Sequence, residues 1–336
     1  MSVNFKHMPL SLSVDGNNAD SLSQWRSEMD RAFPPLTIHA ESSIPFTAQY
    51  RSAGTKELQI SDIQASAHVV ERNPGVISSK NFEYYKISLQ VSGTGLMTQG
   101  NRELQLTPGT IAVYDTAQPY NLRFDDDYRF VVAMFPKHAL DIPERLAGEL
   151  VAYPLDGTSG PGSMLSSYLM GIVENLHYLL GAAGERLART GLDLLTTLLA
   201  AELQLQGGSS SPARRSLLVE ICYYINEHLT DSNLTPESIA SAHFISIRQL
   251  YNVFQEYGIS VAQWIKLRRL TECRRDLADP FKMSQTVSQV ASHWSFFEAT
   301  YFSRIFKEYF GLSPTEWRKY SLERKKFPNF LQDVSI

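Results

Sequence analysis

The sequence is poor in the residues that build disulfide frameworks and metal sites. It has only 2 cysteines, Cys222 and Cys273, and both lie inside helical patterns without CxxC spacing. Its 8 histidines stand far apart, and none falls between residues 81 and 135. A metal-dependent barrel enzyme needs clustered histidine and carboxylate ligands. The sequence therefore predicts buried, reduced cysteines, no metal site and no cofactor.

Long apolar runs and catalytic motifs are also missing. No apolar run approaches the ~20 residues of a membrane span, and the N-terminus has no basic-then-apolar leader. GxSxG, HExxH and phosphate-cradling glycine loops do not occur. We therefore expect a cytoplasmic protein without membrane contact, catalytic residues or enzyme activity, with a cupin-type enzyme as a remote alternative. The acidic run Asp125-Asp126-Asp127 is interpreted as a solvated turn.

The chain lacks a strong net charge, but its charge is unevenly distributed. Net charge is −4 over 336 residues, of which 43% are hydrophobic, enough for two or three domains. Residues 1–211 hold 15 Lys+Arg against 22 Asp+Glu, whereas residues 212–336 hold 16 against 13. The basic excess lies in the C-terminal part, where it would favour phosphate binding.

Short alternating apolar and polar runs fill the chain between about residues 36 and 136. Turn residues such as Pro108-Gly109 separate them, which is typical of an antiparallel barrel or sandwich. A short helix is expected before it, at Ser21–Ala32. The predicted strands include Tyr85–Val91, Gly95–Thr98, Glu103–Leu106, Thr110–Tyr114 and Tyr128–Phe135.

Helical periodicity replaces this alternation at about residues 163–206. One apolar stripe holds Met164, Tyr168, Ile172 and Leu176, and a leucine-rich stripe follows it. The two stripes predict a helical hairpin. Packing against the barrel alone would explain part of this apolar surface. Because the hairpin has more leucine than one packed face needs, we also expect it to form a homodimer.

These changes of texture define the predicted domains. A sensor and dimerisation domain is expected over residues 1–206, with the β-domain and hairpin inside it. The Gly- and Ser-rich residues 207–213 predict a flexible linker. A helical DNA-binding domain is expected over residues 214–320, so the predicted fold class is α+β.

One short pattern occurs twice in the last ninety residues. The copies hold Ile239-Ala240, Leu250, Phe254 and Gly258, and then Val290-Ala291, Phe302, Phe306 and Gly311. From alanine to glycine is 18 residues in the first copy and 20 in the second. Each copy predicts a short helix, a turn and an amphipathic helix closed by glycine. This is the plan of a helix-turn-helix, whose second helix enters the DNA major groove.

Helix-start signals divide this region further. Thr235, Ser246, Ser260 and Thr286 are expected N-caps. The helix after Ser260 is expected to join the two units over about 19 residues, or ~28 Å. Major grooves on one DNA face recur every ~34 Å, so this helix could hold two recognition helices about one turn apart. Its cations, which we expect to face solvent or phosphates, are Lys266, Arg268, Arg269, Arg274 and Arg275.

The residues opposite each apolar stripe are the predicted DNA contacts. Arg248 and Arg304 could pair with guanine and Asn252 with adenine, although Arg248 could instead support helix packing. Ala299 and Thr300 suit a thymine methyl group or a phosphate, and Lys307 a phosphate. The full predicted set is Ser246, Arg248, Gln249, Tyr251, Asn252, Ala299, Thr300, Ser303, Arg304 and Lys307.

The segment from Leu234 to Arg318 resembles the DNA-binding domain of AraC/XylS-type transcriptional regulators. One position departs from that pattern, because Ser295-Phe296 stands where the family usually has Gly-Phe in the second turn. The turn favours a positive φ, so Ser295 could alter the angle of the second recognition helix. The matching residues are Ile239-Ala240, Arg248, Leu250, Phe254, Gly258, Ser260, Trp264-Ile265, Arg268, Leu277, Val290-Ala291, Phe296, Phe302-Ser303-Arg304, Phe306-Lys307, Tyr309-Phe310-Gly311 and Ser313-Pro314.

Residues 80–136 resemble the cupin-like sensor barrel found in part of that family, through Gly93, Pro108-Gly109, Pro119-Tyr120 and Pro136. The resemblance implies an activator that binds promoter DNA, contacts RNA polymerase and responds to a small-molecule effector in the barrel. No effector-binding residue is identified. The alternative is a regulator without a ligand, controlled by its abundance or by a protein partner.

Overall fold

The computed structural model describes residues 17–40, 45–55, 57–77, 84–180, 183–205 and 212–322. The chain divides into two compact units. Among the described residues, the β unit holds those from Asn17 to Lys137 together with Leu150–Leu198. The helical unit holds His138–Glu149 and the described residues from Leu199 to Leu322. Most of the predicted linker 207–213 lies outside the described residues.

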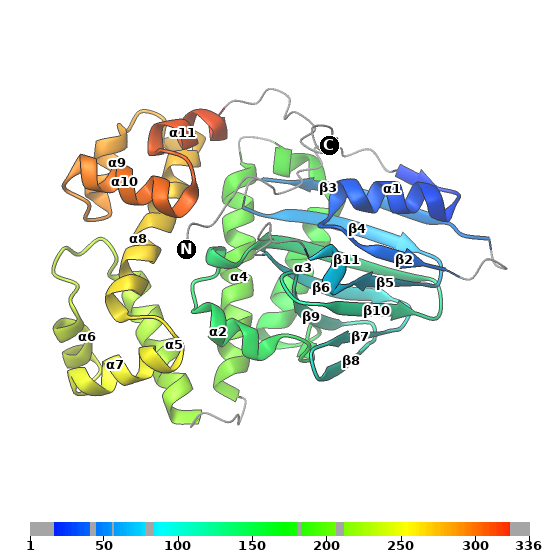
Figure 1. The fold of residues 1–336 in the computed structure, drawn as a ribbon, viewed down its shortest axis with the longest axis horizontal. Coiled ribbons are helices and arrows are strands. Elements are labelled where there is room, and N and C mark those ends of the chain that lie inside the picture. Colours follow the sequence, from blue (N-terminus) through cyan, green and yellow to red (C-terminus); the bar gives the residue numbers. More distant parts are fainter. Residues whose placement is uncertain are drawn as a thin grey trace. The chain divides into compact units, whose positions relative to one another are not determined.

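Two antiparallel sheets form the β unit (Figure 1). Their strands are β1 (Asn17–Ala19), β2 (Thr37–His39), β3 (Ala48–Gly54), β4 (Gln59–Ala65), β5 (His68–Arg72), β6 (Tyr84–Ser92), β7 (Gly95–Gln99), β8 (Arg102–Leu106), β9 (Thr110–Asp115), β10 (Tyr120–Phe124), β11 (Tyr128–Pro136) and β12 (Leu155–Asp156). The larger sheet has the order β1-β3-β4-β11-β6-β9-β12, and the smaller one β2-β5-β10-β7-β8. The predicted antiparallel β-domain is confirmed, but as two sheets in the described residues instead of a closed barrel.

The named strand predictions are confirmed to within a residue or two at each end. They succeeded because residues of one parity face a shared core while the others face outward. That core includes Ile63, Met97, Leu122 and Val132, one from each of four strands. The run Asp125-Asp126-Asp127 is exposed between β10 and β11, as expected of a turn.

The predicted N-terminal helix is also confirmed, as α1 (Leu22–Ala32). Ser21 caps it by accepting a hydrogen bond from the backbone N–H of Gln24. Its buried face places Trp25, 1% exposed, and Met29 in the β-unit core.

The hairpin consists of α3 (Gly160–Glu174), the 3₁₀ segment η4 (Leu176–Leu180) and α4 (Gly184–Leu205). The predicted stripe through Met164 is wrong at that residue, which is 63% exposed. The stripe is confirmed at Ile172 and Leu176, which are buried, but at its start the buried residues are Leu165 and Leu169. A period of 3.6 residues allows either neighbour to begin an apolar stripe, so the sequence alone did not choose between them. Outside the hairpin, the remaining short helices between residues 74 and 150 are η1 (Pro74–Val76), η2 (Lys137–Ala139), α2 (Glu144–Ala147) and η3 (Gly148–Leu150).

The helical unit contains the two predicted helix-turn-helix pairs. Its elements are α5 (Pro212–Glu227), α6 (Pro236–Ala242), α7 (Ile247–Glu256), α8 (Val261–Ala278), η5 (Pro280–Lys282), α9 (Val287–His293), α10 (Ala299–Phe310) and α11 (Pro314–Leu322). The pairs α6–α7 and α9–α10 lie toward opposite ends of α8 (Figure 1). Cys222 and Cys273 are buried and not disulfide-bonded, as predicted.

Side-chain caps begin the helices where the sequence predicts them. Thr235, Ser260 and Thr286 each accept a hydrogen bond from the third helical residue, whose side chain returns one to the cap backbone. Ser246 accepts from Gln249 at the start of α7. The start of α10 was not assigned from sequence, and its cap is Glu298.

Both helix-turn-helix turns contain a non-glycine residue in the left-handed region. Phe244 has φ +53° in the first turn, and Ser295 has φ +63° in the second. The positive φ expected at Ser295 is confirmed, and the first turn has the same strain. Phe244 is 97% exposed, so little packing is lost if its side chain is removed.

We predict that Phe244→Gly stabilises the protein by about 1 kcal/mol, because glycine removes the left-handed penalty of an L-residue. Phe244→Ala is the matched control, since it removes the ring but retains the Cβ atom that causes the strain. Urea unfolding at unchanged m-value measures the difference. Equal stability of the two variants would contradict the strain.

Candidate DNA-binding surface

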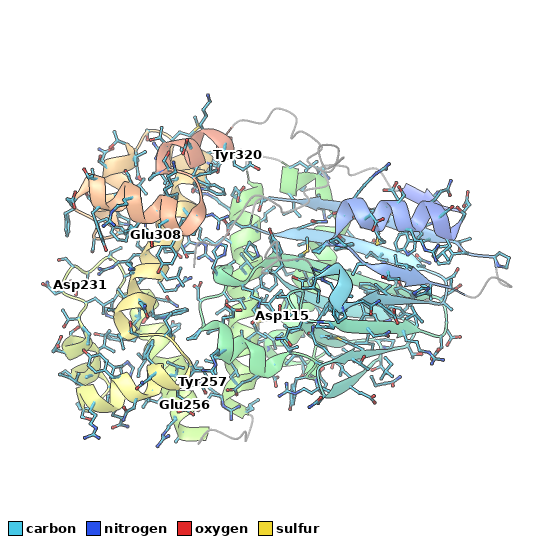
Figure 2. All side chains as sticks on the ribbon, in the orientation of Figure 1. Asp115, Asp231, Glu256, Tyr257, Glu308 and Tyr320 are labelled. Atoms are coloured by element: carbon cyan, nitrogen blue, oxygen red, sulfur yellow. The ribbon has the colours of Figure 1, made fainter. Side chains whose placement is uncertain are left out.

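The two recognition helices are amphipathic and bury one face each. Leu250 and Phe254 of α7 are fully buried, as are Phe302 and Phe306 of α10 at 1% exposure or less. These residues repeat at i and i+4, so each helix has one inward stripe and leaves its other face to solvent. Glu256 and Tyr257 at the end of α7 and Glu308 on α10 are labelled in Figure 2.

All the residues predicted to contact DNA are exposed in the structure. The first helix exposes Ser246, Arg248, Gln249, Tyr251 and Asn252, and the second exposes Ala299, Thr300, Ser303, Arg304 and Lys307. On α10 the guanidinium of Arg304 lies 5.6 Å from the ring centre of Tyr301. Each set occupies one outward face of one helix, as groove readout requires.

A groove of about 590 Å³ runs beside α7. It is lined by four of the predicted contacts together with Arg214 of α5, which was not selected from the sequence. Arg214 lies 3.8 Å from Glu256 in an exposed ion pair. Its only sequence signal is a basic pair, Arg214-Arg215, after the predicted linker. The fold adds Arg214 to this surface because α5 packs on α7.

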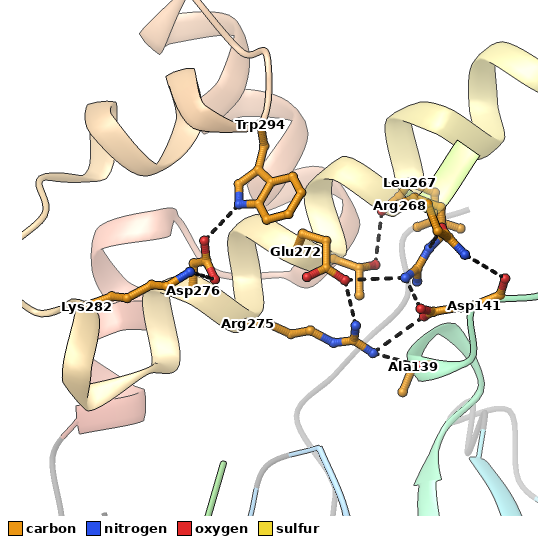
Figure 3. A network of polar contacts seen from close by, with 11 residues as sticks. Ala139, Asp141, Leu267, Arg268, Glu272, Arg275, Asp276, Lys282 and Trp294 are labelled. Carbon is orange, nitrogen blue, oxygen red and sulfur yellow. Dashed lines mark hydrogen bonds and ion pairs between the residues drawn. The ribbon is translucent and has the colours of Figure 1, made fainter. Parts of the chain in front are cut away.

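The predicted solvent exposure of the α8 arginines is wrong for three of them. Arg268, Arg274 and Arg275 are 1%, 3% and 9% exposed. Arg268 donates to Asn226 Oδ1 at 3.0 Å. Arg275 pairs with Glu272 at 2.6 Å (Figure 3). The cause is tertiary, because helix α5 and the segment 138–149 pack on α8.

The segment 138–149 supplies further partners for these cations. Asp141 forms ion pairs with Arg268 and Arg275, and the carbonyl of Ala139 accepts from Arg275 at 2.9 Å (Figure 3). Burial, followed by the neighbouring arginine charges, holds the pKa of His138 well below its usual range. A neutral His138 imidazole can accept the hydrogen bond from the Arg274 guanidinium.

Polar contacts attach the second helix-turn-helix pair to α8 and to the loop between α5 and α6. Asp276 accepts from the indole N–H of Trp294 at 2.9 Å and pairs with Lys282 at 2.6 Å (Figure 3). Ser295 donates its hydroxyl to the carbonyl of Thr230 at 3.1 Å. Glycine could not make this last contact. The departure from the usual glycine therefore adds a hydrogen bond next to the strained turn.

Other kinds of site find little support in the described ranges. No group of three or more His, Cys, Asp or Glu side chains there is arranged to hold a metal ion. None of the helices described combines the length and apolarity needed to cross a membrane.

Comparisons with known proteins agree with this architecture. The AraC-binding-like domain family matches residues 25–200, and a helix-turn-helix domain family matches residues 239–320. The transcriptional activator NphR of a Rhodococcus species is 27% identical over 88% of both chains. The arabinose operon regulatory protein of Escherichia coli K12 is 27% identical over 70% of this chain and 80% of its own.

A solved structure gives the same fold assignment. The AraC-like transcriptional activator CuxR has a TM-score of 0.50 at 23% identity, covering 77% of this chain and 94% of its own. The first family match alone spans more than half of the 336 residues. The chain therefore belongs to the AraC family of DNA-binding transcriptional regulators.

Proposed function

We propose that this regulator reads two consecutive major grooves of promoter DNA with α7 and α10. One observation supports the proposal: the outward faces of both helices expose side chains that are able to contact bases, and both helices pack on the single helix α8. At ~1.5 Å per residue, the 18 residues of α8 span ~27 Å, comparable with the ~34 Å between grooves.

The contacts divide into base readout and phosphate positioning. Arg248 and Arg304 pair with guanine, and Asn252 pairs with adenine. Lys307 and Arg214 neutralise phosphates, and the remaining polar residues of the set fix the register. The exposure of Arg248 favours base readout over a role in helix packing.

The control of this activity belongs to the β unit in our proposal. A small-molecule effector binds between its sheets and changes promoter binding, and the protein activates transcription through RNA polymerase in the cytoplasm. Relatives named as transcriptional activators support this direction. Control by abundance or by a protein partner, without an effector, is the alternative. No enzyme activity is proposed, because these relatives are named as regulators.

The hairpin supplies the homodimer contact in this proposal. Two large apolar residues of this region, Met164 and Tyr178, are 63% and 54% exposed. Burying such side chains against a second copy removes apolar surface from water. A dimer then presents four recognition helices to two half-sites.

Selection of bound sequences from random DNA by the full-length protein tests the proposed function. We predict two short blocks about 10–10.5 bp apart, duplicated for a dimer and with affinity that falls steeply with salt. An unduplicated pair of blocks would remove the dimer from the proposal. A single block would mean that one recognition helix does not read bases.

Substitutions on α10 separate base readout from phosphate binding. Arg304→Ala should relax specificity at one base pair and cost about 1–3 kcal/mol on the best sequence. Lys307→Ala should weaken all sequences alike and reduce the salt slope by about 1. Arg123→Ala, an exposed arginine in the β unit, is the control and should change neither. Uniform weakening by Arg304→Ala would rule out base readout by that residue.

A further inference from the structure

Lys86 of β6 is a buried cation without a described acidic partner. Its side chain is 3% exposed, and its Nζ donates to the Tyr120 hydroxyl at 3.2 Å and lies 4.0 Å from the ring centre of Phe33. Among the residues that the structure describes, no Asp or Glu pairs with it. Burying an ammonium group without a counter-ion is costly, so a fold rarely retains one without a use.

The β unit contains a second buried lysine, Lys137, whose role is structural. Lys137, directly after β11, is 9% exposed and pairs with Asp115 at 2.8 Å. Asp115 is itself 4% exposed and caps the turn after β9 by accepting from Ala117 N–H. Lys137 therefore has an acidic partner inside the fold, whereas the described contacts of Lys86 are to a hydroxyl group and to aromatic rings.

Strand register surrounds Lys86 with further polar groups. Directly paired residues share a sheet face, and the pairing across the larger sheet runs Gln59, Met134, Lys86, Tyr114. Met134 and Tyr114 belong to the core between the two sheets, so this row faces inward. The next inward row adds the hydroxyls of Ser61 and Ser88, which both pair with Val132.

The facing sheet contributes a second cation at the same place. Tyr120, which contacts Lys86, pairs in register with Arg72. Arg72 is fully buried and donates to the carbonyls of Thr116 at 2.8 Å and Pro35 at 2.6 Å. The rings of Tyr114 and Tyr120 meet edge to face at 5.0 Å. Two positive charges and two phenol groups thus gather in one interior region.

One acceptor in this interior also lacks a partner. The amide nitrogen of Gln59 donates to Ala32 O and Ser52 Oγ, both at 3.2 Å. Its amide oxygen is buried and has no hydrogen-bond partner within the described structure. A buried acceptor without a partner costs free energy. Both defects would be corrected by a bound molecule with an acidic group and a hydrogen-bond donor.

We propose that Lys86, Tyr114 and Tyr120 bind the carboxylate of a small organic acid between the two sheets, with Arg72 as a second positive charge. This inference rests on the effector control proposed above and names the chemical class of that effector. The carboxylate pairs with the Lys86 ammonium and accepts from the tyrosine hydroxyls. The Phe33, Tyr114 and Tyr120 rings lie beside the apolar part of the acid.

The electrostatics of the ligand-free interior agree with this assignment. Burial, followed by the charge of Arg72, holds the pKa of Lys86 well below its usual range. A neighbouring anion is the group that stabilises the charged form of a buried lysine. Burial raises the pKa of Tyr114 and Tyr120 well above the usual value of a tyrosine. Both phenols therefore keep the protons that they donate.

The stability of the ligand-free full-length protein distinguishes a binding lysine from a structural one. Lys86→Met should raise the melting temperature by at least about 2 °C, because it removes a buried charge and keeps most of the volume. Lys137→Met is the matched control and should lower it by about 5 °C or more, since it isolates the buried Asp115. A lower melting temperature for Lys86→Met would overturn the proposal.

Binding is measured with acetate, benzoate and succinate against acetamide, benzamide and succinamide at equal ionic strength. The acids should raise the wild-type melting temperature by at least about 2 °C when saturating, and the amides should not. Lys86→Met should lose this difference, and Tyr120→Phe should weaken acid binding about 10-fold. Equal shifts for acids and amides, or an acid response retained by Lys86→Met, would overturn the site.

DNA binding by the same variants separates this site from the proposed function. Lys86→Met should retain wild-type affinity for the selected sequence and lose only the response to acid. If the acids bind without any change in DNA affinity, the result would support the binding site and contradict the proposed effector control. A protein that binds the acids but selects no DNA sequence would contradict the proposed function and leave the site intact.

Discussion

The buried ion pairs along α8 are the constraint on which the DNA-reading arrangement depends. Arg268 and Arg275 share Glu272, and Asp276 binds Trp294 in the second helix-turn-helix pair. Removing one partner from such a buried pair typically costs about 3–5 kcal/mol, because the other charge is left unpaired. Asp276 attaches α8 to the second helix-turn-helix pair, whereas Arg268 and Arg275 attach α8 to α5 and to the segment 138–149. A two-groove reader needs these attachments more than it needs further cations on α8.

The two units use buried charge in opposite ways. In the helical unit each buried arginine of α8 contacts a carboxylate, a carbonyl or an aromatic ring. These charges therefore hold α8 against the elements packed on it. In the described part of the β unit, Lys86 contacts a phenol and aromatic rings and no carboxylate. Paired buried charges hold their elements together, whereas an unpaired buried charge costs free energy that a ligand can recover. The first arrangement suits a DNA-reading scaffold and the second suits a sensor.

The helices and the exposed faces of the candidate DNA-binding surface could be predicted from sequence because their signals are local. Leu250 and Phe254 define the buried face of α7 within about one turn. Ser246 and Thr286 each cap the helix that follows by accepting from the backbone N–H three residues ahead. The burial of Arg268 could not be predicted, since its partner Asp141 lies more than a hundred residues away. The sequence also could not show that the β-domain forms two sheets and not a closed barrel, because alternation within a strand does not say which sheet edges pair.

Altered spacing within a half-site tests the central claim that α8 fixes the separation of the two recognition helices. Affinity of the full-length protein would be measured for the selected duplex and for versions with 5 or 10 bp inserted between the two blocks. A helix of fixed length cannot follow either insertion, so both should lower affinity at least about 10-fold, to that of a single block. Wild-type affinity for the 10-bp insertion, with loss only at 5 bp, would show that the joint stretches with the DNA and would contradict the account.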